Sequence, residues 1–115
     1  MNGPLQEPTF LILAALAEES MHGYGVIQAV AALSDGRVNL RPGTVYGAVD
    51  RLAEQGLVAA DREEVVEGRL RRYYRLTDSG AETLEAEAQR LAANVDAAVI
   101  RLKRRAKSRT RLAHG

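Results

Sequence analysis

Cysteine and tryptophan are absent from this chain of 115 residues, and histidine occurs only at His22 and His114. Without cysteine the sequence excludes disulfide scaffolds, thiolate zinc sites and cysteine nucleophiles, and it permits a reducing compartment. Two histidines almost a whole chain apart leave very little from which to build a histidine metal site or a Ser-His-Asp relay. We therefore expect a protein that is not an enzyme and that uses no metal or other cofactor.

Long apolar runs are also missing. The longest, residues 10–17, has eight residues, far fewer than the roughly 20 that a membrane-spanning helix needs. No Lys or Arg precedes this run and no small-residue cleavage site follows it, which is unlike a secretory signal peptide. The sequence thus predicts no membrane contact and a cytoplasmic protein.

Charge is distributed unevenly along the chain. The composition is 46% hydrophobic and 27% charged, with a net charge of +1, which suits one compact unit with a buried core. Residues 101–115 hold seven basic residues and no acidic one, so the first hundred residues hold 16 − 7 = 9 basic against 15 acidic, a balance of −6. The net charge alone does not indicate a nucleic-acid partner, and such a partner must be argued from individual positions.

Glycine and proline divide the first half of the chain into three expected helices, over residues 9–19, 22–33 and 42–55. Apolar residues recur in them at spacings of three and four, as in helices that bury one face. Pro42 suits a first helical turn because its missing N–H would be unpaired there anyway, and Gly56 ends the third helix. The inner stripe of this helix is expected to be Val45, Ala48, Val49 and Leu52.

The pattern changes to strands after Gly56. Residues 57–66 and 70–76 flank Glu67-Gly68-Arg69, which indicates a β-hairpin. Successive side chains of a strand point to opposite faces, so we expect Tyr74 in the core and Tyr73 away from it. Three helices followed by a two-stranded wing predict a winged helix-turn-helix.

A long helix is expected after Thr77-Asp78-Ser79-Gly80, which break the second strand. Its apolar residues keep a seven-residue repeat, the pattern of a seam against a partner helix. The residues of this seam are Leu84, Ala88, Leu91, Val95, Ala98 and Leu102. The alternative is antiparallel packing of the helix on its own domain.

The third helix is the expected DNA reader. A short helix with small residues in its first turn fits a major groove about 12 Å wide, because glycine lets the backbone approach closely. The positions expected to face bases and phosphates are Arg41, Thr44, Tyr46, Gly47 and Arg51. The alternative is a solvated surface on which Asp50 and Glu54 pair with Arg51.

Arginines crowd the tip of the wing, at Arg69, Arg71 and Arg72, where we expect them to lie on phosphates or in a minor groove. The alternative is that acidic residues of the opposite strand neutralise them as cross-strand pairs; these are Glu63, Glu64 and Glu67. In the second helix Tyr24 is a candidate to donate its hydroxyl to a phosphate, and His22 is expected at the start of the helix.

Three motifs occur in the order found in one family of bacterial regulators. They are His22-Gly23-Tyr24, Pro42-Gly43-Thr44-Val45-Tyr46, and Arg71-Arg72-Tyr73-Tyr74-Arg75-Leu76-Thr77 running into Gly80. Over roughly residues 8–90 the chain resembles the PadR family of transcriptional regulators, in its compact subgroup with one C-terminal helix. The resemblance implies a mainly α fold with a small β-hairpin, in which residues 1–78 form the winged helix-turn-helix and 79–105 a dimerisation helix. From their charge and terminal position we expect residues 106–115 to be a flexible basic tail.

The chain departs from the family at two positions, where Arg41 replaces a frequent Ser and Gly47 a frequent Pro. Arg41 cannot cap the helix as Ser would, and Gly47 weakens the helix by about 1 kcal/mol relative to Ala. Some relatives bind planar aromatic effectors in the dimer cavity by stacking them on tryptophan. This chain has no Trp, so the identity of a small-molecule effector stays open.

The resulting prediction is a homodimeric, sequence-specific regulator, a repressor, which binds a palindromic operator in double-stranded DNA. The alternative is a winged-helix module that binds another protein without specific DNA binding, because the acidic balance of residues 1–100 repels DNA.

Overall fold

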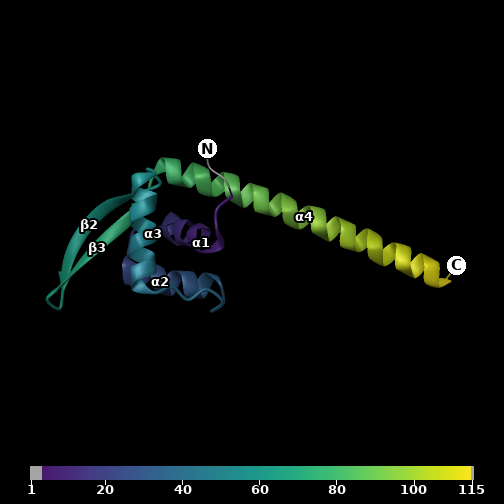
Figure 1. Ribbon diagram of the computed structural model, residues 1–115, viewed down its shortest axis with the longest axis horizontal. Helices are drawn as coiled ribbons and strands as arrows, with labels where there is room; N and C mark the ends of the chain where they lie inside the picture. Colours follow the sequence, from purple (N-terminus) through teal and green to yellow (C-terminus); the bar gives the residue numbers. More distant parts are fainter. Residues whose placement is uncertain (1–3, 115) are drawn as a thin grey trace. The chain divides into compact units, whose positions relative to one another are not determined.

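The computed structural model describes residues 4–114 as a mainly helical protein (Figure 1). Its elements in chain order are α1 (Glu7–Glu18), β1 (Met21–His22), α2 (Gly23–Leu33), α3 (Pro42–Glu54), β2 (Val58–Val66), β3 (Arg69–Leu76) and α4 (Asp78–His114). This order confirms the winged helix-turn-helix and the long C-terminal helix. The chain forms two compact units, the first ending at Glu85 and the second beginning at Ala86, within α4.

The core of the first unit lies where the first three helices meet the start of β2. Its buried side chains come from all four elements and are aliphatic, which suits the close packing of a small core. The fully buried ones lie on the three helices. The largest of them are Ile12, Leu13, Val26, Val30, Val45 and Val49. All four residues of the expected inner stripe of α3 are buried, so this helix is held by one face and its other face remains exposed.

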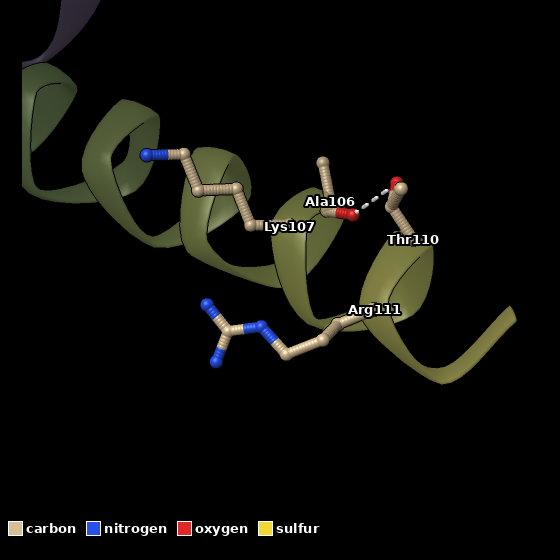
Figure 2. A pocket seen from close by; sticks show the side chains of 4 residues that line it. All are labelled: Ala106, Lys107, Thr110 and Arg111. Carbon is tan, nitrogen blue, oxygen red and sulfur yellow. Dashed lines mark hydrogen bonds between the residues drawn. The ribbon is translucent and has the colours of Figure 1, made fainter. Parts of the chain in front are cut away.

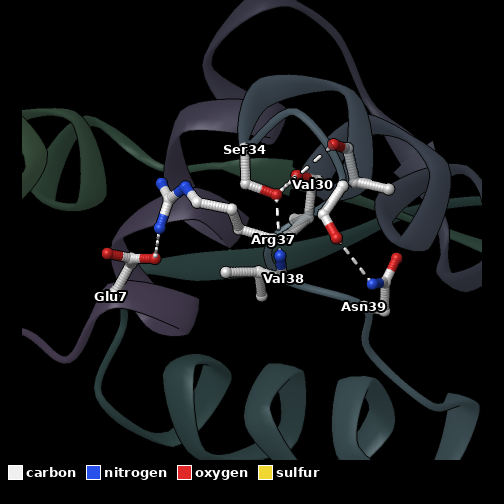
Figure 3. Close-up of polar contacts among 8 residues, drawn as sticks. Glu7, Val30, Ser34, Arg37, Val38 and Asn39 are labelled. Carbon is white, nitrogen blue, oxygen red and sulfur yellow. Dashed lines mark hydrogen bonds and ion pairs between the residues drawn. The ribbon is translucent and has the colours of Figure 1, made fainter.

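The turn between α2 and α3 is held by polar contacts (Figure 3). Ser34, only 2% exposed, donates its hydroxyl to the carbonyl of Val30 at 2.8 Å and accepts the N–H of Val38 at 3.0 Å. Arg37 forms an ion pair with Glu7 at 3.0 Å, which joins the turn to the start of α1. The buried hydroxyl thus links the last turn of α2 to Val38 in the connection that leads to α3.

The sheet has three antiparallel strands in the order β1-β3-β2, one more than the hairpin expected from the sequence. Met21 and His22 pair with Tyr74 and Tyr73, and a strand of two residues is too short to show the alternation that identifies strands. The hairpin itself is present, but Arg69 belongs to β3 and the turn is shorter than expected. Its two residues, Glu67 and Gly68, both have positive φ, as a type I′ turn requires.

The last helix continues past the expected boundary at residue 105. It runs from Asp78 to His114 because residues 106–114 contain neither Gly nor Pro and are rich in Arg, Lys, Ala and Leu, which favour helix. The flexibility of residues 106–115 stays a prediction. Within the described part of the chain, no helix has both the length and the apolar character needed to cross a membrane.

Candidate nucleic-acid interface

The outer face of α3 carries the side chains expected to meet DNA. Arg41, Thr44, Tyr46 and Arg51 are exposed, whereas Gly47 is half-buried. Arg41 is the N-cap residue and makes no side-chain capping bond, as expected, and Pro42 occupies the first turn. Nothing lies within 4 Å of a Cβ built at Gly43. The first turn of α3 therefore presents open backbone and small side chains, which suits close approach to a groove.

Arg51 lies on this face without an acidic partner. Its Nη1 is 3.5 Å from the position that a Cβ would take at Gly47, one turn earlier in the helix. Among residues 4–114 no carboxylate, including those of Asp50 and Glu54, lies within ion-pairing distance of Arg51. Arg51 also lines a hollow of about 200 Å³ together with residues just before and within the first turn of α1. Its charge is thus available to a phosphate or a base.

Tyr46 is more constrained than an ordinary surface tyrosine. A Cβ built at Gly23 would lie 2.9 Å from three atoms of the Tyr46 side chain, so the ring lies against the start of α2. The side chain is nevertheless 48% exposed. Tyr24, in the same first turn of α2, is 63% exposed. Gly23 therefore allows the Tyr46 ring to lie close to the start of α2 while both tyrosines stay exposed.

The three wing arginines differ in their surroundings. Arg72 forms an ion pair with Glu63, its cross-strand neighbour, at 3.4 Å, and both side chains are well exposed. Arg71 lies opposite Glu64 in the register, and Arg69 lies opposite Val66. Within residues 4–114 neither Arg69 nor Arg71 has an acidic group at ion-pairing distance. Cross-strand pairing thus accounts for one of the three arginines.

Glu64 does not pair with Arg71 because it has other partners. Tyr73 donates its hydroxyl to Glu64 Oε2 at 2.9 Å, and Arg62 Nε lies 3.4 Å from Glu64 Oε1. The guanidinium of Arg62 also lies 3.9 Å above the ring of Tyr73, a cation–π contact. These hydrogen bonds lower the pKa of Glu64 because they stabilise its charged form.

Sequence reasoning missed this cluster of Arg62, Glu64 and Tyr73. A β-bulge between Ala60 and Glu63 inserts an extra residue into β2, and it brings both Arg62 and Glu64 to the side of Tyr73. A bulge cannot be recognised from alternation, since it interrupts the alternation itself. Tyr73 lies on the sheet face opposite Tyr74, which packs against the core as expected. The cluster connects β2 to β3 on the face of the sheet opposite Tyr74.

His22 caps α2, as its expected place at the start of that helix implies. Its Nδ1 accepts the N–H of Gly25 at 3.2 Å, and its ring meets the edge of Tyr73 at 5.2 Å between centroids. Burial, with a smaller contribution from the Arg71 cation, lowers the pKa of His22 from its ordinary value of 6.5, although Glu64 acts in the opposite direction. The neutral imidazole is the form that can act as the cap.

We expect this cap to make stability depend on pH. The unfolded chain protonates His22 at a higher pH than the folded chain, so the contribution of His22 is complete above pH 6.5 and is lost as the pH falls through the lowered pKa. Urea denaturation should show a decreasing free energy of unfolding between about pH 7.5 and 5.5. His22→Asn, which keeps a neutral cap, should remove most of this decrease. An equal decrease in both proteins would contradict the assignment.

The residues of the expected seam lie along α4. Leu84 packs against the core of the first unit, whereas Ala88, Leu91, Val95, Ala98 and Leu102 are exposed in the single chain. Exposed apolar residues at helical spacing are the feature that a partner helix would cover.

Glu87, on the same helix, is buried and accepts two hydrogen bonds from the guanidinium of Arg90, at 2.6 and 3.0 Å.

These features define a winged-helix fold of the DNA-binding type. Residues 12–86 match the profile of the Transcriptional regulator PadR-like family. The chain therefore belongs to the PadR-like family of transcriptional regulators, as its three motifs indicated. Members of this family are in general regulators and not enzymes.

Several curated proteins are similar to the chain over about 80 residues. It is 42% identical to the Uncharacterized 37.1 kDa protein in transposon TN4556 of Streptomyces fradiae, over 71% of this chain and 22% of that protein. It is 34% identical to the transcriptional regulator YqjI of Escherichia coli, over 69% of this chain and 36% of that one. For the transcriptional regulator Rv3488 of Mycobacterium tuberculosis the identity is 35%, over 70% and 71%. The chain thus spans 22% of the length of the first of these relatives and 36% of the length of the second.

Solved structures share the fold. A PadR family transcriptional regulator from Eggerthella lenta has 28% identity and a TM-score of 0.65, over 82% of this chain and 80% of that one. Bacillus subtilis PadR in complex with operator DNA has 20% identity and a TM-score of 0.62, over 70% of this chain and 46% of that one. The second likeness concerns the fold alone.

Proposed function

We propose that this protein is a sequence-specific DNA-binding repressor that acts as a homodimer on a palindromic operator. The observation that carries the proposal is the exposed polar face of α3. This face holds Thr44 and Arg51 on a helix whose opposite face is fully packed, and Arg51 has no acidic partner among the described residues. A rigid helix with an uncompensated guanidinium matches the guanine edge in a major groove.

The wing is proposed to supply affinity more than sequence choice. Arg69 and Arg71 are exposed near the glycine turn, and no carboxylate of the described residues lies within ion-pairing distance of them. A hairpin tip held by one turn is better suited to contact phosphates than to hold a two-pronged contact with one base. Because the fold is shared with a PadR protein in complex with operator DNA, we assign α3 to the major groove and the wing to the neighbouring backbone.

The exposed seam of α4 supports the proposed dimer. Two such helices related by a two-fold axis would cover the same apolar residues on each other. The two copies of α3 would then read two half-sites in opposite directions, so the operator is expected to be palindromic. Repression needs only that the dimer occupies a site where it excludes polymerase. A protein with this role acts where the chromosome is, which for a regulator of this family is the cytoplasm.

The rival function is that of a protein-binding module, which the balance of −6 over residues 1–100 favours. The two functions differ in their response to salt. DNA binding releases counterions and weakens steeply as salt increases, whereas a protein contact need not depend on salt in this way. Selection of binding sites from random DNA, followed by affinity measurements over a range of salt concentrations, therefore tests the proposal. No enrichment of any sequence, or a flat salt response, would favour the rival.

Alanine variants test whether α3 supplies sequence specificity and the wing supplies affinity. Arg51→Ala and Thr44→Ala should weaken binding to the selected site by about 10-fold or more, with smaller effects on random DNA, because each removes a base contact. Arg71→Ala should weaken both DNAs by similar factors and lower the slope of log affinity against log salt by about 1 per subunit. Arg72→Ala is the matched control, since Glu63 already pairs with Arg72.

Each variant also has an outcome that would contradict its assignment. Unchanged binding of Arg51→Ala would remove this residue from the reading face. A change of preferred bases in Arg71→Ala, with the salt slope unaltered, would mean that the wing reads sequence. Thermal denaturation of all four variants should change little, because exposed substitutions alter folding by no more than about 0.5 kcal/mol. Repression itself is tested by transcription in vitro from a promoter that contains the selected site.

A further inference from the structure

Positively charged side chains are concentrated at the end of α4, outside the winged helix-turn-helix. Residues 101–111, here called the basic segment, contain no acidic residue, and all of their side chains are exposed. The cations of the segment are Arg101, Lys103, Arg104, Arg105, Lys107, Arg109 and Arg111. No carboxylate of residues 4–114 forms an ion pair with any of them. The charge is therefore uncompensated within the described chain.

The cations surround most of the helix. At 100° per residue they leave free only an arc of about 120°, around Leu102, Ala106 and Thr110. The hydroxyl of Thr110 donates to the carbonyl of Ala106 at 3.0 Å, and Lys107 and Arg111 extend back along the helix from successive turns (Figure 2). The free arc continues the seam that we assign to dimerisation, so the cations would face outward in the dimer.

This arrangement weakens the isolated helix. Several cations stand four residues apart, where like charges repel each other and destabilise a helix. The attraction of the helix dipole for cations helps only within the last turn. An anion with closely spaced charges would relieve this repulsion along the whole basic segment, and a nucleic-acid backbone has that spacing.

We propose that the basic segment binds the phosphate backbone of DNA outside the base pairs read by α3. The inference rests on the proposed function. Five of the seven cations are arginines, whose planar guanidinium matches phosphate oxygens. A helix that lies on a membrane surface needs a broad apolar face with aromatic or leucine side chains. The free arc of the basic segment holds a single leucine, Leu102, beside Ala106 and Thr110, and it contains no aromatic residue, so the segment suits DNA better than a lipid surface.

Binding at a second place on the same DNA strengthens the complex without any change in base reading. Once α3 has bound its site, the basic segment meets the flanking backbone at a high effective concentration. The gain should therefore depend on the length of the flanking DNA and on salt, but not on its sequence. The dimer would hold a longer footprint than its two reading helices require.

The test uses the full chain and two duplexes that contain the selected site. One duplex ends at the site, and the other extends by about two helical turns, ~21 base pairs, on each side. The charge-removing variant combines Arg104→Gln, Arg105→Gln, Lys107→Gln and Arg111→Gln. Its matched control combines Arg104→Lys, Arg105→Lys and Arg111→Lys, which keeps every charge. Gln and Lys are similar in helix propensity to the residues they replace, and circular dichroism checks that α4 is intact.

For the wild type and the lysine control we expect tighter binding to the long duplex, with a salt slope steeper by about 0.9 for each additional phosphate contact. The glutamine variant should bind the short duplex like the wild type and lose the gain on the long one. Equal salt slopes on both duplexes for the wild type would overturn the proposal. So would unchanged binding by the glutamine variant, or a loss confined to binding of phosphatidylserine vesicles.

The outcome is separable from that of the proposed function. If no sequence is selected from random DNA, the assignment of α3 as a sequence reader fails. The two duplex lengths can then be made of random sequence, and the glutamine variant still tests the basic segment. Loss of length dependence in that variant alone would support phosphate binding by the segment without an operator.

Discussion

Replacing Leu91 with glutamate is expected to convert the proposed dimer to a monomer and to lower affinity for the selected DNA site by about 100-fold or more. Leu91 lies in the middle of the exposed seam of α4, and in the proposed dimer a carboxylate there would lose its hydration against an apolar partner face. A monomer reads a single half-site and loses the gain of about 10²–10⁴ that two linked contacts provide. Sedimentation and titration with the selected site measure the two effects.

Ile100→Glu is the matched control for this prediction. Ile100 is 45% exposed and Leu91 38%, and nine residues along the same helix place Ile100 about half a turn around the axis from Leu91. The control should remain dimeric with wild-type affinity. If both variants became monomers, the dimer would depend on the helix as a whole and not on its apolar stripe. A stable dimer in Leu91→Glu would remove this part of α4 from the interface.

Replacing Gly80 with alanine is expected to destabilise the first unit by about 3–5 kcal/mol. A Cβ at this position would overlap the carbonyl oxygen of Leu57 and lie 2.7 Å from Cδ1 of Leu76. The same carbonyl accepts the N–H of Thr77 at 3.1 Å, and Thr77 caps α4 by accepting the N–H of Gly80 at 3.0 Å. The added methyl group thus cannot be accommodated without separating α4 from the start of the wing.

Thermal denaturation should show a fall in the melting temperature of more than ~12 °C, at about 4 °C per kcal/mol for a domain of this size. Gly43→Ala is the matched control, because nothing lies within 4 Å of a Cβ at that position. Alanine in the first turn of α3 should leave stability unchanged or raise it by up to about 1 kcal/mol. A melting temperature of Gly80→Ala equal to that of the wild type would mean that the close approach to Leu57 is absent.

Helix α3 was predictable because the residues that determine it lie within one segment. The buried residues of this helix follow the 3.6-residue helical period, and Pro42 marks where the helix begins. These buried residues are Val45, Ala48, Val49 and Leu52. The same local logic predicted the hairpin and the placement of Tyr74 against the core. The exposed positions of α3 followed directly, since a buried stripe determines which residues remain outside. Their contacts with DNA stay a prediction.

The surroundings of the wing arginines were not predictable in this way. Each of them had a glutamate nearby in the sequence, yet only Arg72 has an ion pair, with Glu63. The bulge in β2 directs Glu64 to Tyr73 and Arg62, and it leaves Arg71 without an acidic partner among the described residues. The register of the sheet and its bulge determine which arginines have an acidic partner. Neither feature can be recognised from the spacing of residues along the sequence.

The sequence by itself determined the order of the elements, the buried face of α3 and the concentration of cations at the end of α4, because each depends on residues that are neighbours along the chain. Only the tertiary structure decided that Met21 and His22 form a third strand and that Gly80 must be glycine. Both depend on backbone segments that are distant in sequence: β3 supplies the partners of β1, and Leu57 supplies the carbonyl that Gly80 approaches. Such contacts arise when the helices and the wing pack together, and a local pattern does not contain them.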